Sequence, residues 1–125
     1  MRSFYTLTAL TWVGSAIAQL PQPGWKSSDP VTAVLTLTPQ TGKDDALAAY
    51  IQHGKNVTTT ECPANIAFIS FKVTGKDQYV VIERYTNQTA MFQWVAGPQH
   101  TELVKEFLPL ANILGSGVES DMNLF

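Results

Sequence analysis

The chain contains 125 residues, of which 45% are hydrophobic and 14% are charged, and its formal net charge is −2. This length fits one domain, because domains usually contain about 50–250 residues. The high apolar content and the low net charge exclude an intrinsically disordered chain. Eight Lys and Arg residues stand against ten Asp and Glu residues, which argues against a nucleic-acid partner because phosphate binding requires a basic surface.

Cysteine and histidine are rare in this sequence. The single cysteine, Cys62, excludes an intrachain disulfide bond and a zinc site built from several cysteines. The two histidines, His53 and His100, can contribute at most to a sparse metal site. We therefore predict no metal site.

Residues 1–18 have the layout of a secretory signal peptide. A basic start is followed by a mostly apolar run at residues 4–13 and by small residues that end at Ala18. The apolar run is about 10 residues long, which is shorter than the roughly 20 residues of a membrane-spanning helix. We therefore expect a secreted or lumenal protein without a membrane span; a buried N-terminal strand or helix is the alternative.

Residues 19–30 are rich in proline and indicate an N-terminal arm, so we expect the single domain to span residues 31–125. The domain contains N-x-[ST] sequons at Asn56 and Asn87, which are glycosylation sites if the chain enters the secretory pathway. In that oxidising compartment we expect the unpaired Cys62 to be buried rather than to bridge two subunits.

The first part of the domain predicts a strand, a helix and a second strand. Residues 31–38 are rich in β-branched side chains and lie between two prolines. Apolar residues recur at helical spacing in residues 44–58, and the acidic pair at the start of this segment suits the positive end of a helix. After a break that contains a proline, residues 66–73 alternate as a strand does.

The second part of the domain predicts another strand, two helices and a last strand. A glycine-containing turn leads into a strand at residues 78–85. Asn87 is a natural N-cap for a helix at residues 89–96, and a Gly-Pro pair separates it from a helix at residues 98–111. The final strand is expected at residues 118–125.

This β-α-β-β-α-β order predicts an α+β domain of the ferredoxin-like type with an antiparallel sheet. Both faces of the sheet are apolar: Phe68 lies on one face of its strand, and Ile69 and Phe71 lie on the other. The helices can cover only one face, and large exposed apolar patches are uncommon on soluble monomers. We therefore expect a homodimer; the sequence leaves open whether Val80 or Val81 faces the partner.

Four segments resemble the antibiotic biosynthesis monooxygenase (ABM) family: the strand YVVIERY at residues 79–85, the cap Asn87, AMFQW at residues 90–94, and GPQH at residues 97–100. Proteins of this family are dimeric α+β barrels, in which two ferredoxin-like units close a barrel between their sheets. The resemblance extends over residues 31–125 and implies this fold. The same superfamily also contains isomerases, cyclases and haem-degrading enzymes, so the fold does not fix one reaction.

Two branches of the superfamily offer site residues to compare. Of the residues used in haem degradation only Trp94 has a counterpart, and Val104 occupies the position of the axial histidine and cannot bind iron. The positions that surround the substrate in anthrone-oxidising members, an asparagine, a tryptophan and a tyrosine, match Val81, Tyr85 and Met91. Tyr85 keeps an aromatic side chain, and the other two polar groups are absent. The resemblance therefore implies chemistry without a metal or an organic cofactor and disfavours haem.

Cofactor-free oxygenation needs a base or a hydrogen-bond donor that forms and holds a substrate carbanion or enolate. The candidate catalytic residues are Tyr85, His53, Glu83 and His100. Each has an alternative role: His53 on a solvent-facing helix surface, His100 in a cap, and Glu83 in a structural ion pair or a dimer contact. The candidate substrate-binding residues are Trp94, Met91, Val81 and Phe68, although Trp94 also suits core packing.

The sequence and the resemblance together predict a small secreted enzyme that acts on an apolar aromatic or polyketide-like molecule. A cofactor-independent monooxygenase is the leading expectation. A cyclase or isomerase on the same fold and a non-catalytic small-molecule binding protein are the alternatives.

The predicted signal peptide can be tested directly. If it is cleaved after Ala18, N-terminal sequencing of protein secreted by a eukaryotic host will begin at Gln19. Secreted protein that retains Met1 would contradict the prediction.

Overall fold

The computed structural model of the chain describes residues 26–120. This part forms a four-stranded antiparallel sheet in the order β2-β3-β1-β4, with three helices on one face. The predicted ferredoxin-like α+β fold is confirmed. The elements in chain order are β1 (Val31–Pro39), α2 (Asp44–Glu61), β2 (Asn65–Lys72), β3 (Tyr79–Tyr85), α3 (Gln88–Ala96), α4 (Pro98–Phe107) and β4 (Ala111–Ser120).

Three sequence predictions concern residues beyond this part. The signal peptide at residues 1–18, most of the arm at residues 19–30, and residues 121–125 of the expected last strand lie outside the described residues. Within residues 26–120, no helix is long and apolar enough to cross a membrane.

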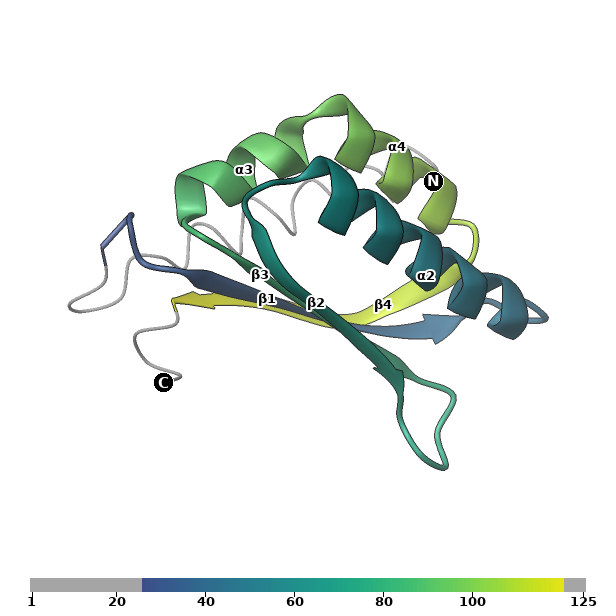
Figure 1. The fold of residues 1–125 in the computed structure, drawn as a ribbon. Coiled ribbons are helices and arrows are strands. Elements are labelled where there is room, and N and C mark those ends of the chain that lie inside the picture. The colour runs from purple at the N-terminus through teal and green to yellow at the C-terminus, as the bar shows by residue number, and fades with distance from the viewer. Residues whose placement is uncertain (1–25, 121–125) are drawn as a thin grey trace.

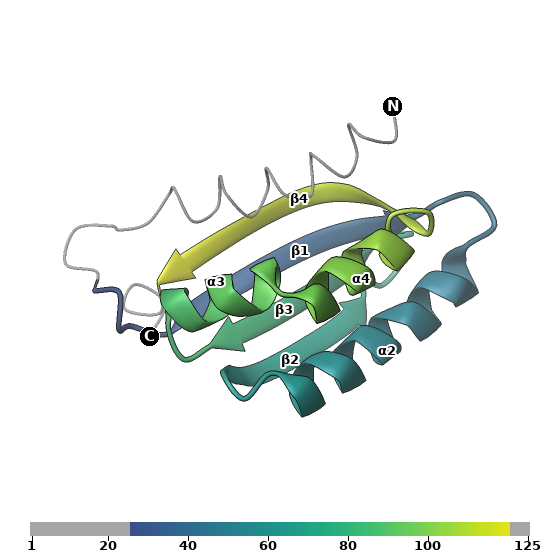
Figure 2. The same cartoon turned by 90° about the horizontal axis from the view of Figure 1, so that it is seen from above.

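The described part of the chain has two layers, one of helices and one of strands. Figure 1 shows the helices stacked above the sheet, and no described element covers the sheet's other face. Seen from above, α2 runs along the side of β2, α3 and α4 lie over the middle of the sheet, and β4 forms the opposite edge (Figure 2). The cavity described below lies in the layer between these helices and the sheet.

The side chains of β3 alternate between the two faces of the sheet. Val81 and Tyr85 are only 5% and 2% exposed and pack in the core beneath the helices. Val80 and Ile82 lie on the other face and are partly exposed. Val81 therefore faces the helices, and Val80 faces the open side.

Two buried clusters hold the helices on the sheet. One surrounds Tyr85 and Trp94, and it includes Cys62, which is 4% exposed. The other surrounds Leu37 and Leu47. The lone thiol is thus buried in the core, as the sequence predicts.

The ends of α3 and α4 follow from local chemistry. The side chain of Asn87 accepts a hydrogen bond of 2.8 Å from the backbone N–H of Ala90, so the predicted N-cap is confirmed. At Gly97, a Cβ atom would lie 3.2 Å from the carbonyl oxygen of Trp94, so a side chain fits poorly at this break. Pro98 then occupies the first turn of α4, where a missing N–H costs nothing.

Asp44 fixes the start of α2 against the sheet. The Tyr79 hydroxyl donates a hydrogen bond of 2.6 Å to Asp44 Oδ1, and Lys72 Nζ lies 3.0 Å from Oδ2. These contacts, the one from Tyr79 foremost, lower the pKa of the Asp44 carboxyl. They connect the first turn of α2 to both β2 and β3.

The boundary between α4 and β4 corrects the sequence prediction. The helix was expected to extend to about Ala111 and the strand to begin at Val118, but α4 ends at Phe107 and β4 begins at Ala111. Pro109 explains the early end, because its ring nitrogen carries no N–H that could donate to the carbonyl oxygen of Lys105 and continue the helix. In β4, Gly115 and Gly117 pair in register with Thr36 and Val34 of β1, and the ladder runs from Ala111 to Ser120 with one register shift at Leu114.

Candidate functional site

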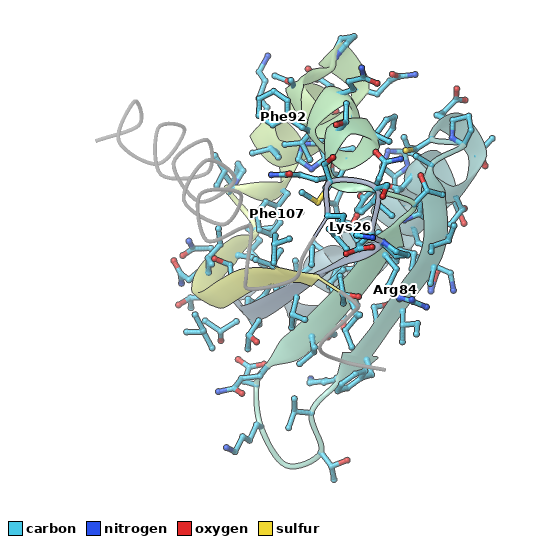
Figure 3. All side chains as sticks on the ribbon, turned by 90° about the vertical axis from the view of Figure 1, so that its left-hand side faces the viewer. Lys26, Arg84, Phe92 and Phe107 are labelled. Carbon is cyan, nitrogen blue, oxygen red and sulfur yellow. The ribbon has the colours of Figure 1, made fainter. Side chains whose placement is uncertain are left out.

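A cavity of about 390 Å³ lies between the helices and the sheet. Its floor includes Leu35, Phe68 and Val81 from three strands, and α2 and α4 form its walls. Figure 3 shows Phe107 on the sheet side of α4, where it lines the cavity, and Phe92 on the outer side of α3. The volume suits a small organic ligand, since such sites usually occupy about 300–1,000 Å³.

Few polar side chains line this cavity: Tyr50, Thr58, Glu83, His100, Thr101 and Lys105. The Tyr50 hydroxyl donates a hydrogen bond of 2.9 Å to the carbonyl oxygen of Leu103 and so connects α2 to α4. Burial, assisted by two glutamates of α4, raises the pKa of Tyr50 to about 12. Tyr50 therefore remains protonated at neutral pH, and its hydroxyl is engaged by the Leu103 carbonyl.

Glu83 is the one carboxyl group among the cavity residues that the structure describes. It lies on the helix-facing side of β3, where it pairs in register with Ala33 and Phe68. Tyr85, two residues further along the same face, donates a hydrogen bond of 2.7 Å from its hydroxyl to Glu83 Oε1. Burial raises the pKa of the Glu83 carboxyl, and the bond from Tyr85 opposes this effect only in part.

Tyr85 remains the donor in this pair. Burial, followed by the nearby Glu83 charge, raises the pKa of its phenol. The neutral hydroxyl can therefore stabilise an ionised Glu83 without competing with it for the role of base.

His100 approaches the cavity from the first turns of α4. Burial lowers its pKa to about 4, and a hydrogen bond with the backbone of Val95 offsets part of the shift. Its ring meets the edge of the Trp94 indole at a centroid distance of 6.4 Å. At neutral pH His100 is thus an uncharged imidazole.

A second, much smaller space adjoins the cavity. It measures about 10 Å³ and shares Glu83, Val95 and His100 with the larger one. Tyr85 and Met91 line only the smaller space. Glu83 and His100 therefore lie at the junction between the two.

The structure brings together most of the site residues that the sequence predicts. Glu83, His100, Val81 and Phe68 line the cavity, and Tyr85 and Met91 line the space beside it. Trp94 lines neither; it packs in the core, and its indole Nε1 has no hydrogen-bond partner among the described residues.

His53 is not brought to this group. Its side chain is exposed on α2, where its ring lies 5.5 Å from that of Tyr50, and it does not line the cavity. This is the solvent-facing helix position that the sequence offers as the alternative to a catalytic role for His53. The predicted glycosylation residue Asn56 is also exposed on α2, whereas Asn87 caps α3.

The cavity has four further polar lining residues that no sequence motif marks: Tyr50, Thr58, Thr101 and Lys105. A helical signal existed for Thr58, which lies seven residues after Ile51 and therefore on the same side of α2. Thr58 is 2% exposed, and Ile51 also lines the cavity. Thr101 and Lys105 are four residues apart on α4 and share one side of that helix in the same way.

Between residues 26 and 120, no group of three or more His, Cys, Asp or Glu side chains is arranged to hold an ion. Val104, at the position of an axial haem ligand, lines the cavity with a hydrocarbon side chain.

The cavity lies beneath the helices of a ferredoxin-like α+β sheet. The profile of the antibiotic biosynthesis monooxygenase family matches residues 30–106, and the chain belongs to this family. No curated protein matches the chain.

Solved structures share the fold at low sequence identity. SnoaB from Streptomyces nogalater, a cofactor-independent oxygenase, is 19% identical with a TM-score of 0.67, and the match covers 74% of this chain and 92% of SnoaB. A Bacteroides thetaiotaomicron protein of unknown function is 11% identical with a TM-score of 0.68, over 74% and 98% of the two chains. MupZ from Pseudomonas fluorescens is 18% identical with a TM-score of 0.65, over 74% and 72%.

The buried His100 predicts a pH-dependent stability. Its folded-state pKa of about 4 lies below the ordinary value of 6.5, so the unfolded chain binds its proton more tightly and stability falls as the pH drops from 6.5 to 4. The loss amounts to at most about 3 kcal/mol. We expect His100→Gln to remove this loss in urea unfolding measured across that range.

His53→Gln is the matched control, because the side chain of His53 is exposed. It should leave the pH dependence of the unfolding free energy as in the unmodified protein. The raised pKa of Glu83 has the opposite sign and favours the folded state as the pH falls; it is common to all three proteins and cancels in the comparison. An equal acid loss in His100→Gln would contradict the assignment.

Proposed function

We propose that this protein is a cofactor-independent monooxygenase that oxidises an apolar aromatic or polyketide-like small molecule in the cavity. The observation that carries the proposal is Glu83, a carboxyl group with a raised pKa in an otherwise mostly apolar space. Membership of the monooxygenase family and the shared fold of SnoaB support it. The proposal includes export of the protein and glycosylation at Asn56 and Asn87, which rest on the sequence alone.

The proposed reaction begins with proton transfer. An activated C–H bond of the substrate, next to a carbonyl or a phenol, loses its proton to the Glu83 carboxylate. The hydrogen bond from Tyr85 to Oε1 holds the carboxylate in place. A raised pKa makes this carboxylate a stronger base than one in water, which suits proton abstraction near neutral pH.

Dioxygen is the oxidant in the steps that follow. The substrate carbanion transfers electrons to dioxygen and forms a C–O bond, and the peroxide takes the proton back from Glu83. Loss of the second C–H proton then breaks the O–O bond and releases water, which leaves a carbonyl group. A CH₂ group and O₂ thus become C=O and H₂O, and the four electrons lost by carbon reduce both oxygen atoms.

The homodimer remains part of the proposal. The open face of the sheet carries Val34, Ile69, Phe71 and Leu114, which are 38%, 51%, 48% and 51% exposed. Val80 lies among them on the central strand β3. An apolar surface of this kind favours burial against the same surface of a second copy, in keeping with the barrel that the family resemblance implies.

Glu83→Gln tests the base. With an anthrone as substrate and dioxygen present, we expect turnover to fall about 10²–10⁴-fold, because the amide cannot accept the proton. Product formation and oxygen uptake are measured together, and in the unmodified protein the rate should rise with pH through a pKa above the ordinary value of 4.5.

Glu61→Gln is the matched control at an exposed carboxyl on the last turn of α2 and should keep full turnover. Full turnover in a folded Glu83→Gln protein would refute the role of Glu83. Binding of the anthrone to the unmodified protein without any product would replace the enzyme by a small-molecule binding protein.

Val80→Asp and Val81→Asp test the dimer. Val80→Asp places a charge on the open face, so we expect a folded monomer in sedimentation where the unmodified chain is a dimer. Val81→Asp buries the charge beneath the helices and should instead destabilise the fold by several kcal/mol. An unmodified chain that sediments as a folded monomer, or a dimeric Val80→Asp protein, would contradict the interface.

A further inference from the structure

The small space beside the cavity has the dimensions of a single small molecule. Its volume of about 10 Å³ corresponds to roughly one water-sized probe. It lies directly above the central strands, where Ala33 of β1 pairs in register with Glu83 of β3 and with Val118 of β4. We call this space the side chamber; its further lining residues are Tyr85, Met91, Val95 and His100.

The lining of the side chamber suits an apolar occupant better than water. Ala33, Met91, Val95 and Val118 contribute only hydrocarbon and thioether groups. A buried water usually needs two to four hydrogen-bond partners, and purely apolar cavities stay dry and accept apolar gases.

Two polar groups of the side chamber are already paired with each other, because the Tyr85 hydroxyl donates to Glu83 Oε1 at 2.7 Å. A water molecule would have to compete with this contact, whereas a diatomic gas needs no hydrogen bond.

The position of the side chamber matters as much as its lining. It shares Glu83, Val95 and His100 with the main cavity. A molecule in the side chamber therefore lies beside the carboxyl group to which a substrate in the main cavity would lose its proton. The side chamber is too small for the organic substrate. A second reactant held there would therefore be kept apart from the substrate.

We propose that the side chamber holds the dioxygen molecule consumed in the oxygenation, an inference that rests on the proposed function. Dioxygen binds beside Glu83 and receives electrons only after the substrate has lost its proton to that carboxylate. The chemistry is that given above: a C–O bond forms, the O–O bond breaks, and one oxygen atom leaves as water.

Ala33→Val tests this site because the two added methyl groups point from β1 into the side chamber. We expect kcat/KM for dioxygen to fall at least about tenfold, while the dissociation constant of an anthrone, measured without oxygen, stays within about twofold. Val118→Ile fills the same space from β4 and serves if Ala33→Val does not fold. Ala67→Val makes the same change on the open face, opposite Arg84 in register, and should leave both constants unchanged.

Crystals of the unmodified protein pressurised with dioxygen give a readout that does not depend on turnover. We expect diatomic density in the side chamber, and none there in Ala33→Val. An ordered water that persists under pressure, an empty side chamber, or an unchanged kcat/KM for dioxygen in a folded Ala33→Val protein would overturn the inference. If the unmodified protein shows no turnover, the proposed function fails; diatomic density in the side chamber would then show a gas site without that reaction.

Discussion

The two-residue alternation of β3 is the constraint on which the rest of this structure depends. β3 lies between β2 and β1, so it is not an edge strand. Each of its side chains must therefore face either the helices or the open side of the sheet. The alternation places Val81, Glu83 and Tyr85 on the helix-facing side. A slip of one residue would exchange the two sets and move the carboxyl group out of the cavity. The same spacing brings the Tyr85 hydroxyl within 2.7 Å of Glu83, so the buried carboxyl and its partner come from one short segment.

The fold could be predicted from the sequence largely because its signals are local. Alternation identifies the first three strands, and Asn87 marks the start of α3. The last strand was misplaced because Gly115 and Gly117 weaken the strand signal at the level of single residues. In the structure they lie opposite Thr36 and Val34 of β1, whose backbone supplies the pairing that local propensity does not. The backbone of β1 thus provides the partner that makes residues 115–117 a strand.

The candidate site could be predicted only in the part that lies on β3 and the start of α3. His53 and Thr58 illustrate the limit. His53 follows Ile51 by two residues, a rotation of about 200° around the helix, so it faces away from the side of Ile51. Thr58 follows Ile51 by seven residues, which is close to two full turns, so it lies on the same side. The sequence period contains this information, but it does not say which side of α2 meets a cavity. That side depends on how α2 is tied to the sheet through Asp44 and on the Tyr50 bond to α4, both of which join residues distant in the chain.

The electrostatics of the cavity suit the base that we propose, because the Glu83 carboxyl lies in a cavity with His100 and that histidine is uncharged at neutral pH. Burial shifts Glu83 and His100 in opposite directions, and both shifts favour the neutral forms. A protonated His100 would pair with Glu83 and lower the pKa of the carboxyl, which would weaken it as a base. With a pKa of about 4, His100 does not hold that charge at neutral pH. Glu83 therefore retains the basicity that desolvation gives it, and the neutral Tyr85 hydroxyl stabilises its ionised form without adding a charge to an apolar space.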